Sequence, residues 1–249
     1  MFKQSAILLL KYKMHVAFVC VGALVLAILG DYSTSKYSLL FPEFLIWAYL
    51  ATAIHIHLLK EEEDRELFDY KTIFGFAGRT FVISAISILP MIIFIITNAR
   101  SFSNTNNNLD LVLFMLYASL FLLAGFLLAF TFLGTMLPAF IADKNKGVMN
   151  AIRRGKNQFG FISWRLLVGP TFICVLSLIP ILIYSTLATD VSDKIISSDL
   201  IDSLQQILIF LLLFFIQAYS VVMTAWILSK AFLRNPSDQD LKMEPPSNL

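Results

Sequence analysis

Six long apolar segments constrain this chain more than any other feature, because each is long enough to cross the hydrocarbon core of a lipid bilayer. They cover residues of about 14–30, 39–59, 77–97, 111–141, 166–187 and 203–229. Backbone N–H and C=O groups cannot be left unpaired in lipid, so segments of this kind are expected to be helical. The sequence therefore predicts an all-α fold, a polytopic membrane bundle of about six transmembrane helices.

The composition excludes a soluble domain of the same size. The chain is 58% hydrophobic and 14% charged, whereas soluble domains are about 45–50% apolar and about a quarter charged. A soluble fold would have to expose much of this apolar surface to water. We expect a single transmembrane domain over residues 1–234. Residues 235–249, with three prolines and alternating charges, are predicted to form a disordered cytosolic tail.

The distribution of basic residues predicts the orientation. Of the 19 lysines and arginines, only Lys36, Arg100 and Lys194 fall in the segments that alternate spans would place outside. All the others fall on the opposite side, which the positive-inside rule assigns to the cytosol. Both ends of the chain are therefore expected to be cytosolic, which requires an even number of spans.

A basic segment between the fourth and fifth spans is the strongest candidate for a binding surface. Over residues 148–166, apolar residues recur at helical spacing, which predicts an interfacial amphipathic helix on the cytosolic leaflet. A shorter cytosolic helix is expected over 60–74, where acidic and basic residues lie four apart. Arg153 and Arg154 are expected to reach outward from the apolar stripe. The residues predicted to contact anionic lipid or a partner protein are Arg153, Arg154, Lys156 and Arg165.

Two segments of the chain resemble each other in sequence. Phe74-Gly75-Phe76 recurs as residues 159–161, and each copy leads into a span with a Ser-x-x-Pro segment, residues 87–90 and 177–180. The second and third spans would then repeat as the fourth and fifth. Chance similarity between apolar sequences gives the same pattern, so both interpretations stay open.

A resemblance to a known family rests on residues 151–156, Ala-Ile-Arg-Arg-Gly-Lys, which precede a proline-bearing span. Together with six spans and cytosolic ends, this segment resembles the bacterial YciC-like six-span inner-membrane proteins. The acidic run 61–66 departs from the basic linker expected of that family. The resemblance implies a multi-pass protein of the bacterial inner (cytoplasmic) membrane, and it implies no activity and no functional residue.

Two polar residues within or near spans are candidates for an intramembrane site. Glu43 follows a proline near the outer end of the second span and is the best carboxylate for a cation or a proton, unless it lies among the outer headgroups. Gln217 lies near the middle of the sixth span. Its amide is expected either to join helices through a serine or threonine or to line a transport site, the candidate partners being Ser84, Ser87 and Thr131.

Residue patterns typical of catalysis, cofactor binding or metal binding are not found. His55 and His57 are two residues apart on a helix, point in different directions and cannot chelate one metal ion. The pair Glu61-Glu62 lacks the arginine spacing of intramembrane proteases, and HExxH, GxSxG, P-loop and GxGxxG motifs are missing from the sequence. Cys20 and Cys174 are expected to be small packing residues.

These features predict a non-enzymatic integral membrane protein without cofactor or metal. The first hypothesis is an accessory or scaffold subunit that binds lipid or another membrane protein, including a second copy of itself. The alternative is a small solute transporter or channel, which the repeat and the prolines within spans favour. A lipid-modifying enzyme ranks third, and nucleic acid is not expected as a partner.

Overall fold

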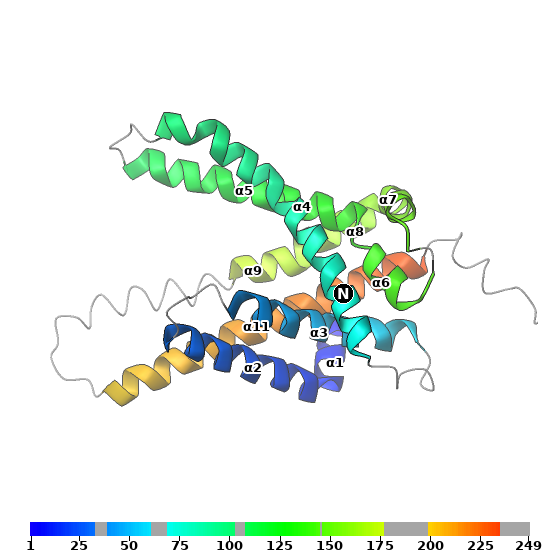
Figure 1. Ribbon diagram of the computed structural model, residues 1–249, viewed down its shortest axis with the longest axis horizontal. Coiled ribbons are helices and arrows are strands. Elements are labelled where there is room, and N and C mark those ends of the chain that lie inside the picture. The colour runs from blue at the N-terminus through cyan, green and yellow to red at the C-terminus, as the bar shows by residue number, and fades with distance from the viewer. Residues whose placement is uncertain (33–38, 61–68, 103–107, 145, 177–198, 235–249) are drawn as a thin grey trace, which may run out of the picture. The chain divides into compact units, whose positions relative to one another are not determined.

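A computed structural model describes residues 1–32, 39–60, 69–102, 108–144, 146–176 and 199–234. Within these ranges every regular element is a helix and no strand occurs, which confirms the predicted all-α fold (Figure 1). The proposed tail 235–249 and the acidic run 61–66 lie outside the described residues, as do residues 177–187 of the fifth predicted span.

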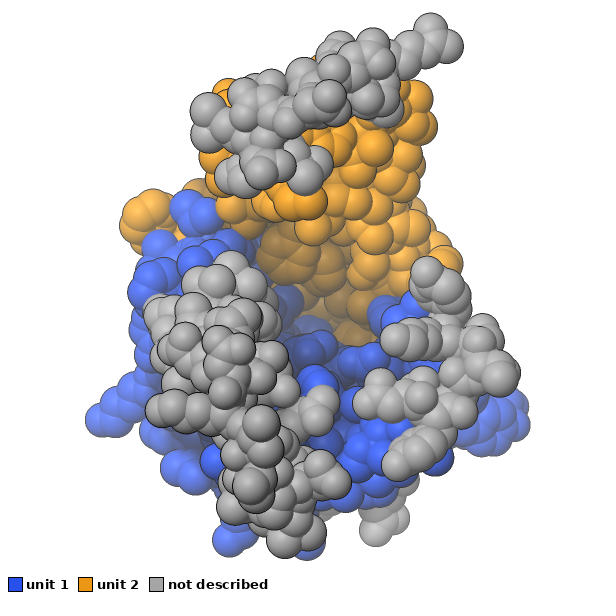
Figure 2. All heavy atoms as spheres, turned by 90° about the vertical axis from the view of Figure 1, so that its left-hand side faces the viewer, with its two compact units in different colours: residues 1–74, 165–227 blue, residues 75–164, 228–249 orange. Residues whose placement is uncertain are grey.

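The chain divides into two compact units, each assembled from segments far apart in the sequence (Figure 2). Unit 1 comprises residues 1–74 and 165–227, and unit 2 comprises residues 75–164 and 228–249. The predicted single transmembrane domain over 1–234 therefore contains two centres of packing.

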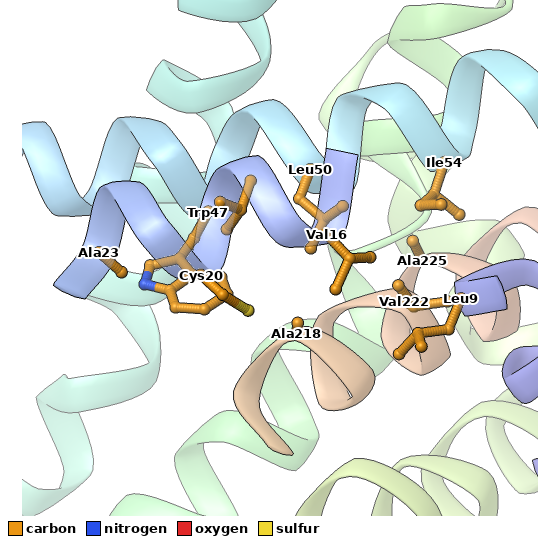
Figure 3. Packing of buried hydrophobic residues seen from close by; sticks show 11 residues of the cluster. Leu9, Val16, Cys20, Ala23, Trp47, Leu50, Ile54, Ala218, Val222 and Ala225 are labelled. Carbon is orange, nitrogen blue, oxygen red and sulfur yellow. The ribbon is translucent and has the colours of Figure 1, made fainter. Parts of the chain in front are cut away.

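Unit 1 is built around α2 (Lys13–Tyr32) and α3 (Leu40–Leu59), which run side by side (Figure 1). Three short elements and one long helix join them: α1 (Phe2–Lys11), the π-helical turn η3 (Leu167–Thr171), α9 (Phe172–Leu176) and most of α11 (Asp199–Leu233). Buried residues recur three and four apart on α2, α3 and α11, so each helix turns one stripe toward a shared core (Figure 3). Its members include Val16, Cys20, Trp47, Leu50, Leu9, Ala218 and Val222. Cys20 is a free thiol buried in this core, as a packing residue would be.

Unit 2 contains α4 (Tyr70–Phe102) from residue 75 onward and α5 (Asn108–Phe132), which form an antiparallel hairpin (Figure 1). The two helices approach closely at Gly125, where an added Cβ would lie 2.1 Å from the carbonyl oxygen of Ser87. Further along, the ring of Phe94 stacks on Phe114 and Phe121 at centroid distances of 5.5 and 4.8 Å. A glycine contact and an aromatic stack therefore hold the hairpin.

The rest of unit 2 is formed by α6 (Met136–Ile141), α7 (Val148–Asn157), α8 (Phe159–Leu166) up to residue 164 and the end of α11. A turn at residues 133–135 separates α5 from α6, so the over-long predicted span 111–141 is interrupted near its end. The single helix predicted over 148–166 is also interrupted. At Gln158, φ is −113°, a non-helical value that ends α7 before α8 begins at Phe159.

Among the described residues, four helical segments are long and apolar enough to cross a membrane: Leu40–Leu59, Tyr70–Asn98, Leu113–Ile141 and Ile207–Leu233. They correspond to four of the predicted spans. The bent pair α1 and α2 gives a fifth if it counts as one span, and α2 contains the first predicted span. The described residues thus provide four or five candidate spans, as expected of a multi-pass membrane protein.

The two Phe-Gly-Phe segments differ in their surroundings. A Cβ at Gly75 would lie 2.7 Å from the ring of Phe140, whereas a Cβ at Gly160 would meet nothing within 4 Å. Phe76 is fully buried, and Phe161 is half-buried. Whether the spans repeat stays a prediction, because residues 177–180 of the second copy lie outside the described residues.

Candidate basic surface on α7

One face of α7, formed by small residues, packs against α5. Ala151 is fully buried, and an added Cβ at Gly155 would lie 2.4 Å from the carbonyl oxygen of Thr131 and 2.6 Å from Cα of Phe132. Both atoms belong to the backbone and cannot rotate away. Small residues four apart allow two helix backbones to touch in this way. The pair Ala151 and Gly155 therefore fixes which side of α7 faces the protein.

Arg154 lies on this inner face, and only 1% of its surface is exposed. Its Nε donates to the Thr135 hydroxyl at 3.4 Å, and an Nη donates to the Thr135 carbonyl at 3.5 Å. The guanidinium carbon lies 5.3 Å from the ring centroid of Phe232. The predicted outward orientation of Arg154 is wrong. Its position three residues after Ala151 and one before Gly155 turns it inward, where oxygen acceptors and an aromatic face receive it.

The opposite side of α7 is exposed and carries both charge and apolar surface. Arg153 and Lys156 are exposed there, and neither side chain makes an ion pair or a hydrogen bond within the described residues. At about 100° per residue the two cations lie about 60° apart around the helix, with Met149 between them. Met149 is 70% exposed, and Val148 and Ile152 are exposed on the flank nearer α5. We call these five residues the α7 surface: Val148, Met149, Ile152, Arg153 and Lys156.

Three other cations of unit 2 have internal partners. The guanidinium carbon of Arg79 lies 3.8 Å from the ring centroid of Phe140, and an Nη of Arg79 donates to the Gly75 carbonyl at 2.8 Å. Arg234 lies 4.2 Å from the ring centroid of Phe161, and Lys146 pairs with Asp143. Internal partners therefore engage these charges. Arg153 and Lys156 keep their donors available to an external ligand, as Lys144 and Lys230 do elsewhere in unit 2.

Exposed aromatic side chains lie on α8, the next helix along the chain. Trp164 is 65% exposed and Phe159 is 45% exposed. The ring of Phe159 also contacts the ring of Phe132 on α5, with a centroid distance of 5.8 Å. This contact holds the Phe159 ring against α5. Tryptophan is enriched where membrane proteins meet the headgroup region, because its ring is apolar and its N–H is polar.

Arg165, the fourth predicted contact residue, belongs to unit 1. Its guanidinium carbon lies 5.7 Å from the ring centroid of Trp226, and the side chain is half-buried. The four predicted cations therefore have three different environments. Arg153 and Lys156 are exposed, and Arg154 is buried on the inner face of α7. Arg165 lies on a tryptophan of unit 1.

Glu43 and Gln217, both in unit 1, occupy different environments. Glu43 is half-buried in the first turn of α3 and accepts a hydrogen bond from Trp47 Nε1 at 3.4 Å. A carboxylate is favoured there by the positive end of the helix dipole. Gln217 is exposed on α11 and makes no hydrogen bond within the described residues, so the interhelical bond predicted for it is not seen.

The three histidines lie in unit 1, and His15 and His57 pack with tyrosines. Nδ1 of His15 is 2.8 Å from the hydroxyl of Tyr49, and the ring of Tyr12 meets His57 edge-on at 4.8 Å. Among the described residues, no group of three or more His, Cys, Asp or Glu could hold a metal ion. These side chains therefore contribute polar contacts between α2, α3 and the bend that precedes α2.

A known relative with a matching sequence or fold could assign a role to the α7 surface. The α7 surface combines exposed cations with exposed apolar side chains. A ligand complementary to it would carry both negative charge and hydrocarbon. Neither a family model nor a curated protein nor a solved structure matches this chain.

Proposed function

We propose that this chain is a non-enzymatic accessory or scaffold protein of a bacterial inner membrane that binds anionic lipid through the α7 surface. In this proposal the chain has six spans, both ends are cytosolic, and α7 lies on the cytosolic leaflet. The positive-inside distribution of lysine and arginine supports that orientation. Membership of the YciC-like family remains part of the proposal.

The observation that carries the proposal is the pair Arg153 and Lys156, exposed without internal partners beside Met149 and Ile152. A bilayer provides both kinds of contact at one depth, because headgroup phosphates lie just above the first methylenes of the acyl chains. Long basic side chains can reach the phosphates while their stems cover apolar surface. The exposed Trp164 fits the same depth. A membrane protein partner with an acidic edge is the other ligand of this chemistry.

Neutralising the two cations tests this proposal. The double variant Arg153→Gln/Lys156→Gln should retain less phosphatidylglycerol, because each cation near an anionic surface contributes about 1 kcal/mol. A loss of about 2 kcal/mol corresponds to about a 30-fold weaker affinity. The protein would be purified in detergent micelles that contain phosphatidylglycerol and phosphatidylcholine. Native mass spectrometry would then measure how much of each lipid stays bound.

The matched control exchanges the cations and keeps the charge. Arg153→Lys/Lys156→Arg should retain phosphatidylglycerol at nearly the level of the unmodified protein. If the neutral variant binds as much phosphatidylglycerol as the control, the α7 surface is not a lipid site. Loss of a co-purifying protein, with lipid retention unchanged, would move the proposal to the protein partner.

A solute transporter is the second candidate, and η3 favours it. This π-helical turn contains Pro170, and the hydroxyl of Thr171 is buried without a hydrogen-bond partner within the described residues. Interrupted helices often mark functional sites in membrane proteins. The recess of about 400 Å³ on α4 and α5 has no charged side chain among the described residues of its lining, where Thr97 and Asn98 are the polar residues. Solute flux into proteoliposomes would support this candidate.

A further inference from the structure

The bend between α1 and α2 separates two helices with different roles. Their axes differ by 83° at Tyr12. The apolar part of α2, residues 14–30, extends about 25 Å, which is close to the thickness of the hydrocarbon. The ten residues of α1 extend about 15 Å, but at this angle they add only about 2 Å to the depth reached by α2. If α2 crosses the membrane, α1 therefore runs almost parallel to the membrane plane.

Three arcs of side chains surround α1. Ser5 and Leu9 are buried, and Leu9 belongs to the core of unit 1. Phe2, Ile7 and Leu10 are exposed, the last two by 54% and 66%, and together they cover an arc of about 140° at 100° per residue. Lys11 and Gln4 are exposed next to that arc, and Lys3 lies within it. One arc thus faces protein, one is apolar and exposed, and one is polar.

Contacts within unit 1 hold α1 in this orientation. The hydroxyl of Tyr219 on α11 donates to the carbonyl of Phe2 at 3.0 Å. A Cβ added to Gly169 of η3 would lie 2.9 Å from Cε of Met1. Leu9 belongs to the buried cluster that contains Val222 of α11 (Figure 3). Because both ends of α1 are held, its exposed arc faces a constant direction relative to α2.

We propose that α1 is an in-plane anchor that binds an anionic lipid leaflet. Phe2, Ile7 and Leu10 enter the acyl-chain boundary, and Lys3, Lys11 and Lys13 bind the headgroup phosphates. This surface belongs to unit 1 and is independent of the α7 surface of unit 2.

Charge and continuity identify the ligand as a lipid leaflet. Residues 1–13 contain three lysines and no aspartate or glutamate, so the surface is complementary to anionic headgroups. The exposed apolar arc continues onto α2 through Met14 and Phe18, which are 76% and 66% exposed. An in-plane helix joined to a lipid-facing span is expected to expose apolar side chains on both sides of the bend, with the basic residues Lys11 and Lys13 beside it.

Spin-label depth measurements test the in-plane geometry. After Cys20→Ala and Cys174→Ala, single labels would be placed at Phe2, Leu10, Gln4, Phe18 and Val25 in phosphatidylcholine vesicles containing phosphatidylglycerol. Labels at Phe2 and Leu10 should reach the same shallow depth, although about 12 Å of helix separates them. The label at Val25 should lie about 10 Å deeper than the label at Phe18. Every labelled side chain is exposed, so the labels should leave the fold intact.

Two results would overturn the in-plane anchor. One is a depth difference near 12 Å between Phe2 and Leu10, which would place α1 along the membrane normal. The other is equal access of an aqueous paramagnetic reagent to Leu10 and Gln4, which would place α1 in water. The expected result is strong oxygen access at Leu10 and strong aqueous access at Gln4.

A charge variant tests the lipid class. Phosphatidylglycerol should reduce the mobility of the Leu10 label relative to pure phosphatidylcholine. The variant Lys3→Gln/Lys11→Gln/Lys13→Gln should lose that reduction, and Lys3→Arg/Lys11→Arg/Lys13→Arg should keep it. If phosphatidylglycerol has the same effect on the neutral and the arginine variants, the leaflet is not recognised by its charge, and that part of the proposal is wrong.

Discussion

Replacing Arg154 with glutamate should destabilise unit 2 by about 3–5 kcal/mol, the usual cost of leaving a buried charge without compensation. The native guanidinium donates to both the hydroxyl and the carbonyl of Thr135 and lies over the Phe232 ring. A carboxylate at this position would face a carbonyl oxygen and the negative face of a ring. Unfolding by SDS titration in mixed micelles would measure the loss.

The control makes the same exchange one residue earlier. Arg153→Glu changes the charge by the same amount at an exposed position, so its effect on stability should stay within about 0.5 kcal/mol. The two variants differ only in burial. Equal destabilisation by the two variants would show that Arg154 is not buried on the inner face of α7 when the protein is in a membrane.

Gly155→Ala should destabilise unit 2 by about 1–3 kcal/mol, since overpacking a tight contact forces backbones apart. The new methyl group would lie 2.4 Å from the Thr131 carbonyl oxygen and 2.6 Å from Cα of Phe132. The α7 helix would have to retreat from α5, and Arg154 would lose its position against Thr135. The same SDS titration would measure this effect.

Gly160→Ala is the matched control, because it adds the same methyl group to the same segment of chain. A Cβ at Gly160 meets nothing within 4 Å, and alanine favours a helix over glycine by up to about 1 kcal/mol. This variant should therefore be as stable as the unmodified protein or more stable. Destabilisation by Gly160→Ala equal to that by Gly155→Ala would contradict the packing of α7 on α5.

The helical fold and several spans could be predicted because lipid imposes strict requirements on a sequence. An apolar run of about 20 residues that cannot leave its backbone unpaired has to be a helix. The run predicted at 39–59 corresponds to α3, Leu40–Leu59, and the run predicted at 111–141 corresponds to the candidate span Leu113–Ile141. Hydropathy alone determined these elements.

Side-chain directions could not be predicted in the same way. Arg153 and Arg154 are identical and adjacent, and only the contact of α7 with its neighbours separates an exposed arginine from a buried one. Ala151 and Gly155 were the available signal, because small residues four apart indicate a close helix contact. The apolar stripe that contains Val148 and Ile152 lies on the exposed side of α7, not on the side that packs against the protein.

The depth of a residue along a span does not determine whether its side chain faces the protein or points away from it. Gln217 was predicted to be deep from its position in the run, yet it is exposed on α11. The bend at Tyr12 lies where Lys11 and Lys13 interrupt the apolar pattern, but hydropathy gives only this interruption and not the angle of 83° between the two helices. Contacts of Tyr12 with His15 and His57 and of Phe2 with Tyr219 accompany that bend.

Sided cysteine labelling tests most directly whether α7 lies on the cytosolic side of the membrane. In a protein carrying Cys20→Ala and Cys174→Ala, a single Asn157→Cys substitution places a thiol on the exposed side of α7. A membrane-impermeant maleimide should label Asn157→Cys in inverted vesicles and not in intact cells. Ser103→Cys, in the connection after α4, should show the reverse pattern. Labelling of Asn157→Cys in intact cells would contradict the proposed orientation and the lipid site on α7 with it.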